Sequence, residues 1–321
     1  MKDFVKQYDI KHKIQRLYIH WDVSTQCNFH CTYCYAIESY GKEWGSIDKW
    51  FKQKLIINNI GRASLPVFLG LLGGEPTLHP HYDELIDNCY SAIKKHKDGR
   101  LYVTTNGSRG NGFFEDHKFY NQMYFLFSFH PEYEGKYGKK FETLVNNITI
   151  ARRRGFKCKV NVMLHYDSRF WKKTHKFIDD IECIEGLEIH PHWLYRDGNP
   201  HAGVVNYTHK FYREFKRFEE YPGYFTFEDQ SGGKELFNDY NMFRDEQNYN
   251  FKGWNCWHNN YEISWDGKVR NVCFADKEDL LLRNFNFFKN IKKICPVVCP
   301  HTSCSCDGLL KIYKERQNDK A

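Results

Sequence analysis

Six apolar runs that alternate with helix-like stretches constrain the fold of this chain more than any other feature. The runs that we expect to form strands span residues 16–24, 66–72, 100–105, 123–129, 156–164 and 186–193. The helices that we expect between them span residues 46–60, 81–95, 139–154 and 169–183. Strands that alternate with helices form a parallel sheet with right-handed crossovers, and six units are too few to close an eight-stranded barrel. The sequence therefore predicts an α/β fold with an open, partial (β/α)6 barrel.

The length of 321 residues allows one large domain and a smaller one. We expect the barrel at residues 1–200, a polar and aromatic connector at 201–250, and a small cysteine-rich domain at 251–321. The uninterrupted apolar run 66–72 is typical of a strand that is covered on both faces. In a βα barrel, functional groups gather at the C-terminal ends of the strands, so motifs at those ends are the candidates for chemistry.

The charge balance is a modest basic excess, because 47 Lys and Arg against 40 Asp and Glu give a formal net charge of +7. This balance permits an anionic substrate or a nucleic acid without requiring one. The run Arg152–Arg154 is also compatible with a nucleotide or nucleic-acid substrate. Cations at the end of a helix, however, also interact favourably with the helix dipole. No apolar run approaches the roughly 18 residues of a membrane span, and residues 1–9 lack the apolar segment of a signal peptide. With twelve cysteines, we expect a reducing, cytoplasmic location and no membrane partner.

Three cysteines lie within eight residues directly after the first predicted strand: Cys27, Cys31 and Cys34. Such a spacing without an export signal indicates metal ligands rather than disulfides. Thiolates are soft ligands, and short cysteine runs hold iron–sulfur clusters. Three thiolates leave one iron of a four-iron cluster open to another ligand. The alternative is a structural zinc site, which needs a fourth Cys or His, and His30 lies between the cysteines where the chain is short.

The C-x3-C-x2-C loop, with Tyr33 before its last cysteine, resembles the signature of radical S-adenosylmethionine (SAM) enzymes. The resemblance implies a [4Fe-4S] cluster on the three cysteines and an open iron that chelates the amino and carboxylate groups of SAM. It also implies that a one-electron reductant such as flavodoxin or ferredoxin drives SAM cleavage. The products are methionine and a 5′-deoxyadenosyl radical, which removes a hydrogen atom from the substrate. A partial barrel is the fold that this family shares.

A second motif, Gly73-Gly74-Glu75-Pro76, ends the second predicted strand and resembles the family's GGEP motif. Two glycines let a backbone approach a ligand closely, although Gly-Gly before Glu-Pro is also an ordinary turn. The resemblance implies that Glu75 accepts hydrogen bonds from the SAM amino group.

Polar residues at the ends of the next two strands complete the expected cofactor pocket. By resemblance, Asn106 and Ser128 contact SAM, with Ser128 near the ribose, and Tyr33 packs beside the cluster and adenine. For His130 we expect a pocket wall or a substrate contact. Many relatives place an arginine for the SAM carboxylate where this chain has Lys139 and Lys140. Either a lysine, for which Lys140 is the candidate, takes this role as a point charge, or another group holds the carboxylate.

Six further cysteines follow in the last quarter of the chain: Cys256, Cys273, Cys295, Cys299, Cys304 and Cys306. The first two flank a predicted hairpin with the turn Asp266-Gly267, which would bring them together. This layout resembles the SPASM/Twitch extension of radical SAM enzymes, and its reduced cysteine count implies one auxiliary [4Fe-4S] cluster. A zinc site is the alternative. The remaining three cysteines, Cys89, Cys158 and Cys183, are expected in the core.

These features together predict a radical SAM enzyme that modifies a peptide, a protein or a small molecule with the help of an auxiliary cluster. A nucleotide or nucleic-acid substrate is the alternative within the same chemistry. Two other classes of protein also bind metals through cysteines: a zinc-binding interaction protein without catalysis and an iron–sulfur electron carrier. A carrier needs neither an open iron nor a GGEP pocket.

Overall fold

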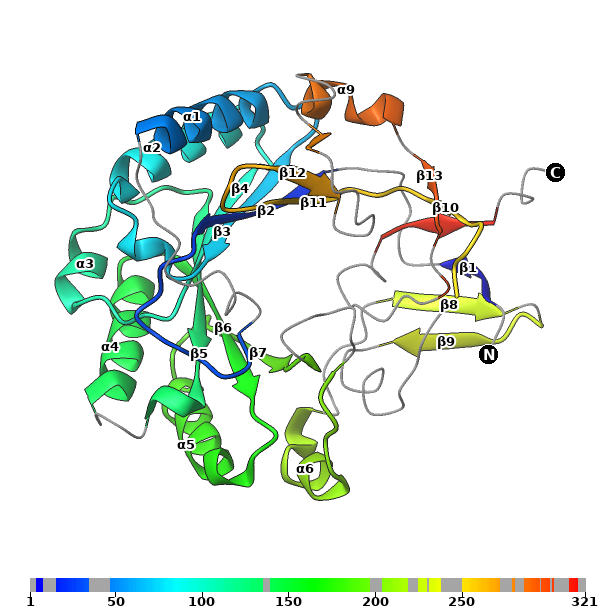
Figure 1. The fold of residues 1–321 in the computed structure, drawn as a ribbon. Helices are drawn as coiled ribbons and strands as arrows, with labels where there is room; N and C mark the ends of the chain where they lie inside the picture. The colour runs from blue at the N-terminus through cyan, green and yellow to red at the C-terminus, as the bar shows by residue number, and fades with distance from the viewer. Residues whose placement is uncertain are drawn as a thin grey trace.

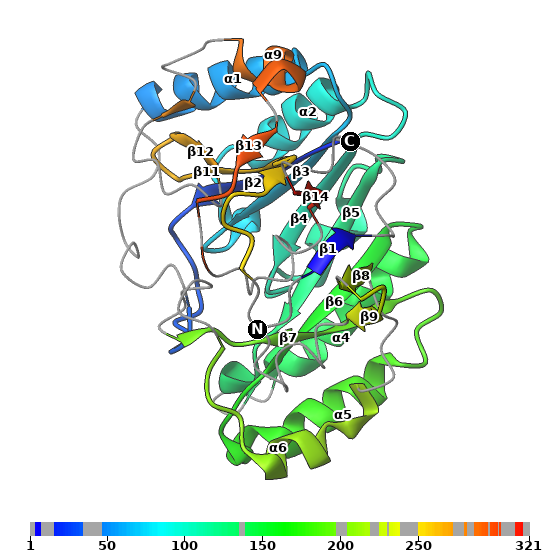
Figure 2. The same cartoon turned by 90° about the vertical axis from the view of Figure 1, so that its right-hand side faces the viewer.

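Figure 1 shows the fold of the chain in a computed structural model. The structure describes residues 4–7, 16–34, 47–134, 139–196, 204–218, 225–229, 231–237, 250–271, 279–280, 286–294, 296–300, 302 and 312–316. Its main feature is an eight-stranded sheet with the strand order β12-β11-β2-β3-β4-β5-β6-β7. The sheet curves, and helices cover its outer face (Figures 1 and 2).

All six predicted strands are present in this sheet. They are β2 (Leu17–Ser24), β3 (Val67–Gly73), β4 (Arg100–Thr105), β5 (Met123–Phe129), β6 (Lys157–Leu164) and β7 (Glu188–Trp193). Each pairs in parallel with the next one along the chain. The predicted fold class, an open partial barrel, is therefore confirmed.

The four predicted helices are also present, with ends within two residues of the expected ones. They are α1 (Ile47–Gly61), α2 (Tyr82–Ile93), α4 (Lys139–Arg153) and α5 (Trp171–Ile181). The sequence did not predict α3 (Asn111–Asp116), a six-residue helix in a glycine-containing stretch of low helix propensity. Three short 3-10 helices, η2 (Pro76–Leu78), η3 (Pro131–Glu134) and η4 (Ser168–Phe170), follow the ends of β3, β5 and β6.

The two faces of the sheet differ in burial. The side chains of Leu17, Ile19 and Trp21 in β2 are at most 1% exposed, because they face the helices. The alternate residues Tyr18, His20 and Asp22 are half-buried or exposed. The expectation that 66–72 is covered on both faces is wrong, since Phe68 and Leu72 are half-buried on the inner face. Helices cover only one face, so the inner face is left to form a concave surface.

The predicted hairpin at Asp266-Gly267 forms, and it joins the barrel sheet. Its strands are β11 (Asn260–Ile263) and β12 (Val269–Asn271), and Gly267 has a φ of +76°, as such a turn requires. Strand β11 pairs in parallel with β2, at the edge opposite β7. Residues expected in a separate second domain thus extend the sheet of the first.

Two three-stranded sheets lie beside the barrel (Figure 1). One contains β1 (Phe4–Gln7), β8 (Phe225–Asp229) and β9 (Lys234–Phe237), and the other β10 (Asn255–Cys256), β13 (Val297–Val298) and β14 (Lys314–Glu315). Within the described ranges, the remaining helices are α6 (His209–Glu214), η7 (Lys216–Phe218) and α9 (Phe287–Ile294). Among the described residues, no helix has the length and apolar character that crossing a membrane requires.

Candidate functional site

Residues 25–34, which we call the cysteine loop, leave the C-terminal end of β2 and pack against the end of β3. The Gly74 N–H donates a hydrogen bond to the Ser24 carbonyl oxygen over 2.6 Å. A Cβ atom on Gly73 would lie 2.1 Å from that oxygen, and one on Gly74 would lie 2.1 Å from the Gln26 carbonyl oxygen. Any larger residue would push the two loops apart. From the sequence we expected these glycines to admit a ligand, and the structure shows that they also admit the cysteine loop.

A cavity of about 230 Å³ lies at this edge of the barrel. The predicted residues that line it are Cys27, Cys31, Tyr33, Cys34, Gly73, Gly74, Asn106, Ser128 and His130. The structure therefore brings together residues from the ends of β2, β3, β4 and β5. Glu75 and Pro76 are not among its lining residues, and the side chain of Lys140 lies outside the part of the chain that the structure describes.

Without a bound metal, the surroundings of the thiols at this cavity favour the neutral, protonated form. Burial raises the pKa of Cys27 to about 11 and raises that of Cys31 further, and the negative charge of nearby thiolates adds to both effects. A bound cation reverses this preference, because a coordinating thiol is deprotonated outright. Three soft sulfur donors beside a cavity thus fit an iron–sulfur cluster.

Among the described residues, no three His, Cys, Asp or Glu side chains gather closely enough to hold one metal ion. In a four-iron cluster each thiolate binds a different iron, so three thiols are spread over one side of the cluster. This arrangement is compatible with the predicted cluster ligands.

Glu75 lies behind the cavity wall, where it joins the ends of β3 and β4. Its side chain is 1% exposed. One carboxylate oxygen accepts from the hydroxyls of Thr77 (2.6 Å) and Thr105 (2.8 Å), and the other accepts from the Asn106 N–H (2.7 Å). Burial raises the pKa of Glu75, while these hydrogen bonds oppose that rise. The expected contact with SAM stays a prediction, and the observed contacts give Glu75 a second role in shaping the cavity wall. Pro76 begins η2 directly behind it.

His130 connects the fourth predicted strand to the cysteine loop. Its Nδ1 atom lies 3.0 Å from the Tyr33 hydroxyl and 3.4 Å from the Cys31 sulfur. Removal of the ring from water, together with nearby His192, lowers the pKa of His130 to about 4. The imidazole is therefore neutral at pH 7 and adds no charge to the cavity.

The last two strands supply a wall of the cavity that the sequence interpretation missed. Its residues are Asn161, Met163, His192, Trp193, Leu194 and Tyr195. Asn161 is the partner of Ser128 in the β5–β6 ladder, and His192 is the partner of Met163 in the β6–β7 ladder. A polar Asn within the apolar run 156–164 was the available signal, because it stands near the same strand ends as Ser128.

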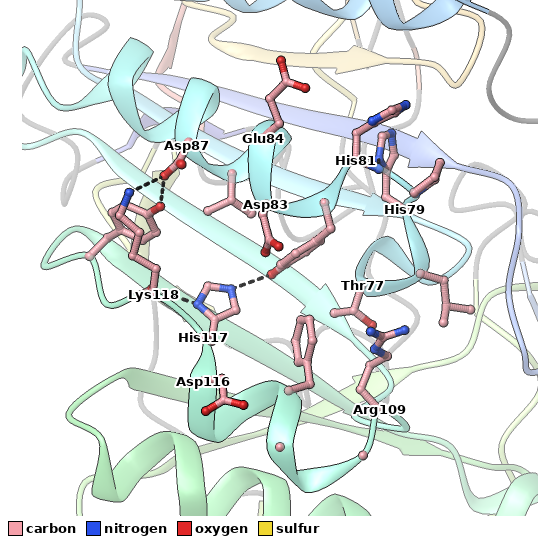
Figure 3. Close-up of a pocket in the computed structure, with 18 of the residues that line it drawn as sticks. Thr77, His79, His81, Asp83, Glu84, Asp87, Arg109, Asp116, His117 and Lys118 are labelled. Atoms are coloured by element: carbon pink, nitrogen blue, oxygen red, sulfur yellow. Dashed lines mark hydrogen bonds and ion pairs between the residues drawn. The ribbon is translucent and has the colours of Figure 1, made fainter.

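Figure 3 shows a second, larger cavity, of about 1100 Å³, that the sequence did not predict. It lies beside α2 and α3 and shares no lining residue with the first cavity. In its wall the Tyr82 hydroxyl lies 3.0 Å from the Nε2 atom of His117, whose Nδ1 lies 2.8 Å from the Lys118 carbonyl oxygen. Arg109, Asp83 and several other charged residues also line it, so it carries both signs of charge.

Two of the six C-terminal cysteines fall within the described residues. Cys256 in β10 and Cys299 after β13 are 3% and 7% exposed. The Cys299 N–H donates to the Trp254 carbonyl oxygen over 2.8 Å, and Cys299 directly follows β13, which pairs with the strand of Cys256. Four predicted ligands lie outside the described residues: Cys273, Cys295, Cys304 and Cys306. The auxiliary metal site therefore stays a prediction.

Two of the three cysteines that were expected in the core are buried, and the third is exposed. Cys89 and Cys158 are 0% and 2% exposed, as expected. The expectation for Cys183 is wrong, because its side chain is exposed two residues beyond the end of α5.

Comparison with known proteins supports a radical SAM domain. Residues 21–176, which include the cysteine loop and the GGEP motif, match the family model described as the Radical SAM superfamily. An S-adenosylmethionine-dependent nucleotide dehydratase from Selenomonas ruminantium is 28% identical over 86 residues, which are 27% of this chain and 28% of that protein. The match thus spans less than a third of this curated relative.

Two solved structures share the fold. One is Streptococcus suis SuiB bound to precursor peptide SuiA, with 15% identity, a TM-score of 0.51, and coverage of 83% of this chain and 64% of that chain. The other is native anSMEcpe with bound AdoMet and Cp18Cys peptide, with 15% identity, a TM-score of 0.52, and coverage of 88% and 82%. At these identities the likeness shows the fold alone.

Proposed function

We propose that this chain, in which residues 21–176 match the radical SAM family model, is an enzyme that reductively cleaves SAM and abstracts a hydrogen atom from a substrate. One observation carries the proposal. The three cysteines of the cysteine loop stand beside a cavity that the ends of β3 to β7 close. That cavity lies at the edge of the barrel where parallel βα folds place their chemistry.

The residues of the cysteine loop have the first role in this proposal. Cys27, Cys31 and Cys34 would hold three irons of a [4Fe-4S] cluster. When bound, the cluster supplies one electron to SAM through its open iron. Tyr33 and Phe29 place aromatic rings in the cavity lining, where they exclude water from the site.

The strand ends have the second role, which is to position SAM. Gly73 and Gly74 present backbone, Asn106 presents an amide and Ser128 a hydroxyl to the cavity. Glu75 fixes the turn that follows the glycines and remains our candidate for the SAM amino group. Lys140 in the first turn of α4 is our candidate for the SAM carboxylate.

The cavity lining and the related proteins bear on the class of substrate. No Lys, Arg, Asp or Glu is among the described residues that line the cavity, so its lining offers a substrate polar and apolar groups. The peptide-bound structures of SuiB and anSMEcpe are compatible with a peptide. A nucleotide is the alternative, favoured by the match to a nucleotide dehydratase. The proposal includes one auxiliary [4Fe-4S] cluster on the C-terminal cysteines. It also includes flavodoxin or ferredoxin as the donor of the electron.

Anaerobic reconstitution tests this function directly. The reconstituted chain is analysed for iron, sulfide and zinc, and is then incubated with SAM and dithionite. We expect iron and sulfide in equal amounts and the formation of 5′-deoxyadenosine. Zinc without iron, or intact SAM after reduction of a cluster, would show that the chain is not a radical SAM enzyme.

A further inference from the structure

The 3-10 helix η3, at the end of β5, contacts both halves of the cysteine loop. The Tyr133 hydroxyl accepts a hydrogen bond from the His30 N–H, between Cys27 and Cys31. The ring of Tyr133 also stacks on Phe29, with 4.3 Å between centroids and 2° between planes. Tyr133, about a hundred positions further along the chain, thus holds the first half of the loop in place.

Glu132 holds the second half of the loop. One oxygen of its carboxylate accepts from the Thr32 backbone N–H over 2.8 Å, and the other accepts from the Thr32 hydroxyl. Thr32 stands between Cys31 and Cys34, so these two bonds fix the backbone that connects two of the predicted cluster ligands. Hydrogen bonds to a charged group are about twice as strong as those between neutral groups.

Glu132 is itself held by a buried histidine. Its side chain is 13% exposed, and that of His165, at the end of β6, is 4% exposed. The Nδ1 atom of His165 accepts from the Asp167 N–H over 3.0 Å, so the proton of the neutral ring is on Nε2. The Nε2–H then donates to the Glu132 carboxylate over 3.2 Å. A chain of hydrogen bonds therefore runs from the end of β6 through Glu132 to the cysteine loop.

We propose that Glu132, oriented by His165, is a positioning residue for the radical SAM cluster. It holds the segment between Cys31 and Cys34 in place and sets a negative charge against the cluster loop. This inference rests on the proposed function for its cluster, but the contact of Glu132 with the loop does not. Groups that orient metal ligands typically change metal affinity or activity about 10- to 100-fold when they are replaced.

Glu132→Gln is the main test variant. In Glu132, one carboxylate oxygen accepts from the Thr32 backbone N–H, and the other accepts from the Thr32 hydroxyl and from His165. A glutamine has only one acceptor oxygen, and its amide nitrogen is a donor, so it cannot make both sets of bonds. Thr32→Val is the second variant, and it removes only the hydroxyl while the backbone N–H remains. Glu115→Gln is the matched control, because Glu115 lies on α3 with a side chain that is 52% exposed and a single ion pair at 3.8 Å to Arg153.

The first measurement uses the full-length, metal-free chain. Iodoacetamide labels the thiols, and peptide mass spectrometry gives the rate at each cysteine, with exposed Cys183 as the internal standard. For Glu132→Gln we expect labelling of Cys31 to be about 5- to 150-fold faster than in the wild type, because an unsatisfied Thr32 opens the loop. Thr32→Val should show a smaller increase, and Glu115→Gln none.

The second measurement uses the reconstituted protein. Electron paramagnetic resonance identifies the cluster whose spectrum changes when SAM is added. In Glu132→Gln this cluster should lose iron to a chelator about 10- to 100-fold faster, and its reduction potential should become more positive, because a negative charge is gone. A residue that only stabilises the fold would change neither its spectrum nor its potential.

The outcomes separate this inference from the proposed function. Wild-type labelling rates in both variants would show that Glu132 does not hold the loop, even if the enzyme cleaves SAM. Faster labelling with an unchanged cluster would show that the contact does not position the cluster, and would also overturn the inference. A wild-type chain without a SAM-responsive cluster would overturn the proposed function, while the labelling rates would still decide whether Glu132 holds the loop.

Discussion

The two cysteine regions of this protein differ in what holds them. The cysteine loop follows an eight-residue strand of the central sheet, and side chains from the ends of β4 and β5 hold it. For example, the Asn28 amide donates to the Ser108 hydroxyl over 2.7 Å. The described C-terminal cysteines, Cys256 and Cys299, are placed instead by the backbone pairing of two-residue strands.

Because of this difference, the described cysteines of the two regions differ in whether they can form a metal site by themselves. The barrel alone brings Cys27, Cys31 and Cys34 to one cavity, because parallel strands end at the same edge. Two buried cysteines on paired strands do not make a four-thiolate site. A metal site in this region would therefore need cysteines beyond these two, and we expect the two sets to load metal independently.

The largest expected effect comes from replacing Cys27, Cys31 and Cys34 together by Ala. Each thiolate is a predicted cluster ligand, so SAM cleavage should be abolished, while the C-terminal set keeps its iron. Production of 5′-deoxyadenosine with dithionite and the iron content of the purified protein check this prediction. Continued formation of 5′-deoxyadenosine by the triple variant would contradict the assignment of the barrel site.

The converse variant replaces Cys256 and Cys273 by Ala. One auxiliary cluster and the SAM cluster give about eight irons per chain by ligand counting, and this variant should lose about four of them. Cleavage of SAM without substrate should stay largely intact, because the barrel site is held separately. A fully reconstituted wild type with four irons, and with zinc in the C-terminal region, would replace the auxiliary cluster with a structural metal.

Glu75→Ala probes the barrel edge itself. If Glu75 binds the SAM amino group, the lost charged hydrogen bond costs about 1.5–3 kcal/mol, or roughly 10- to 150-fold in the dissociation constant of SAM. The variant also leaves Thr77, Thr105 and the Asn106 N–H without their acceptor, so its unfolding free energy should fall. Lower stability with an unchanged dissociation constant for SAM would assign Glu75 to the cavity wall alone.

The smallest expected effect is a pH dependence that belongs to the C-terminal region. His258 is fully buried, and burial lowers its pKa from 6.5 to about 3. A depressed histidine pKa means that the unfolded chain binds the proton more tightly, so stability falls as the pH drops below 6.5. Between pH 7 and pH 5 this residue should lower the unfolding free energy by about 2 kcal/mol.

Urea unfolding of the metal-free chain at the two pH values measures this change, with His258→Phe as the comparison. The variant should lose about 2 kcal/mol less than the wild type over the same interval. An equal loss in both proteins would mean that other groups cause the pH dependence.

The sequence by itself determined the order of the strands and helices and the edge at which the chemistry lies. Apolar periodicity and glycine turns are local signals, and they predicted six strands whose observed ends differ by at most two residues. The spacing of Cys27, Cys31 and Cys34 is also local, because all three lie on one short loop. The glycines before Glu75 marked the next strand end for the same reason.

Only the tertiary structure decided which distant residues meet at that edge. The β11–β12 hairpin pairs with β2, although more than 230 residues separate Ile19 from Tyr261. Glu132 reaches Thr32 across a hundred residues, and the Glu75 carboxylate accepts from Thr105 at the end of the neighbouring strand. Such contacts depend on strand register and on the packing of whole elements, and a single acidic residue in a loop looks the same in the sequence whether it binds a ligand or a neighbouring strand.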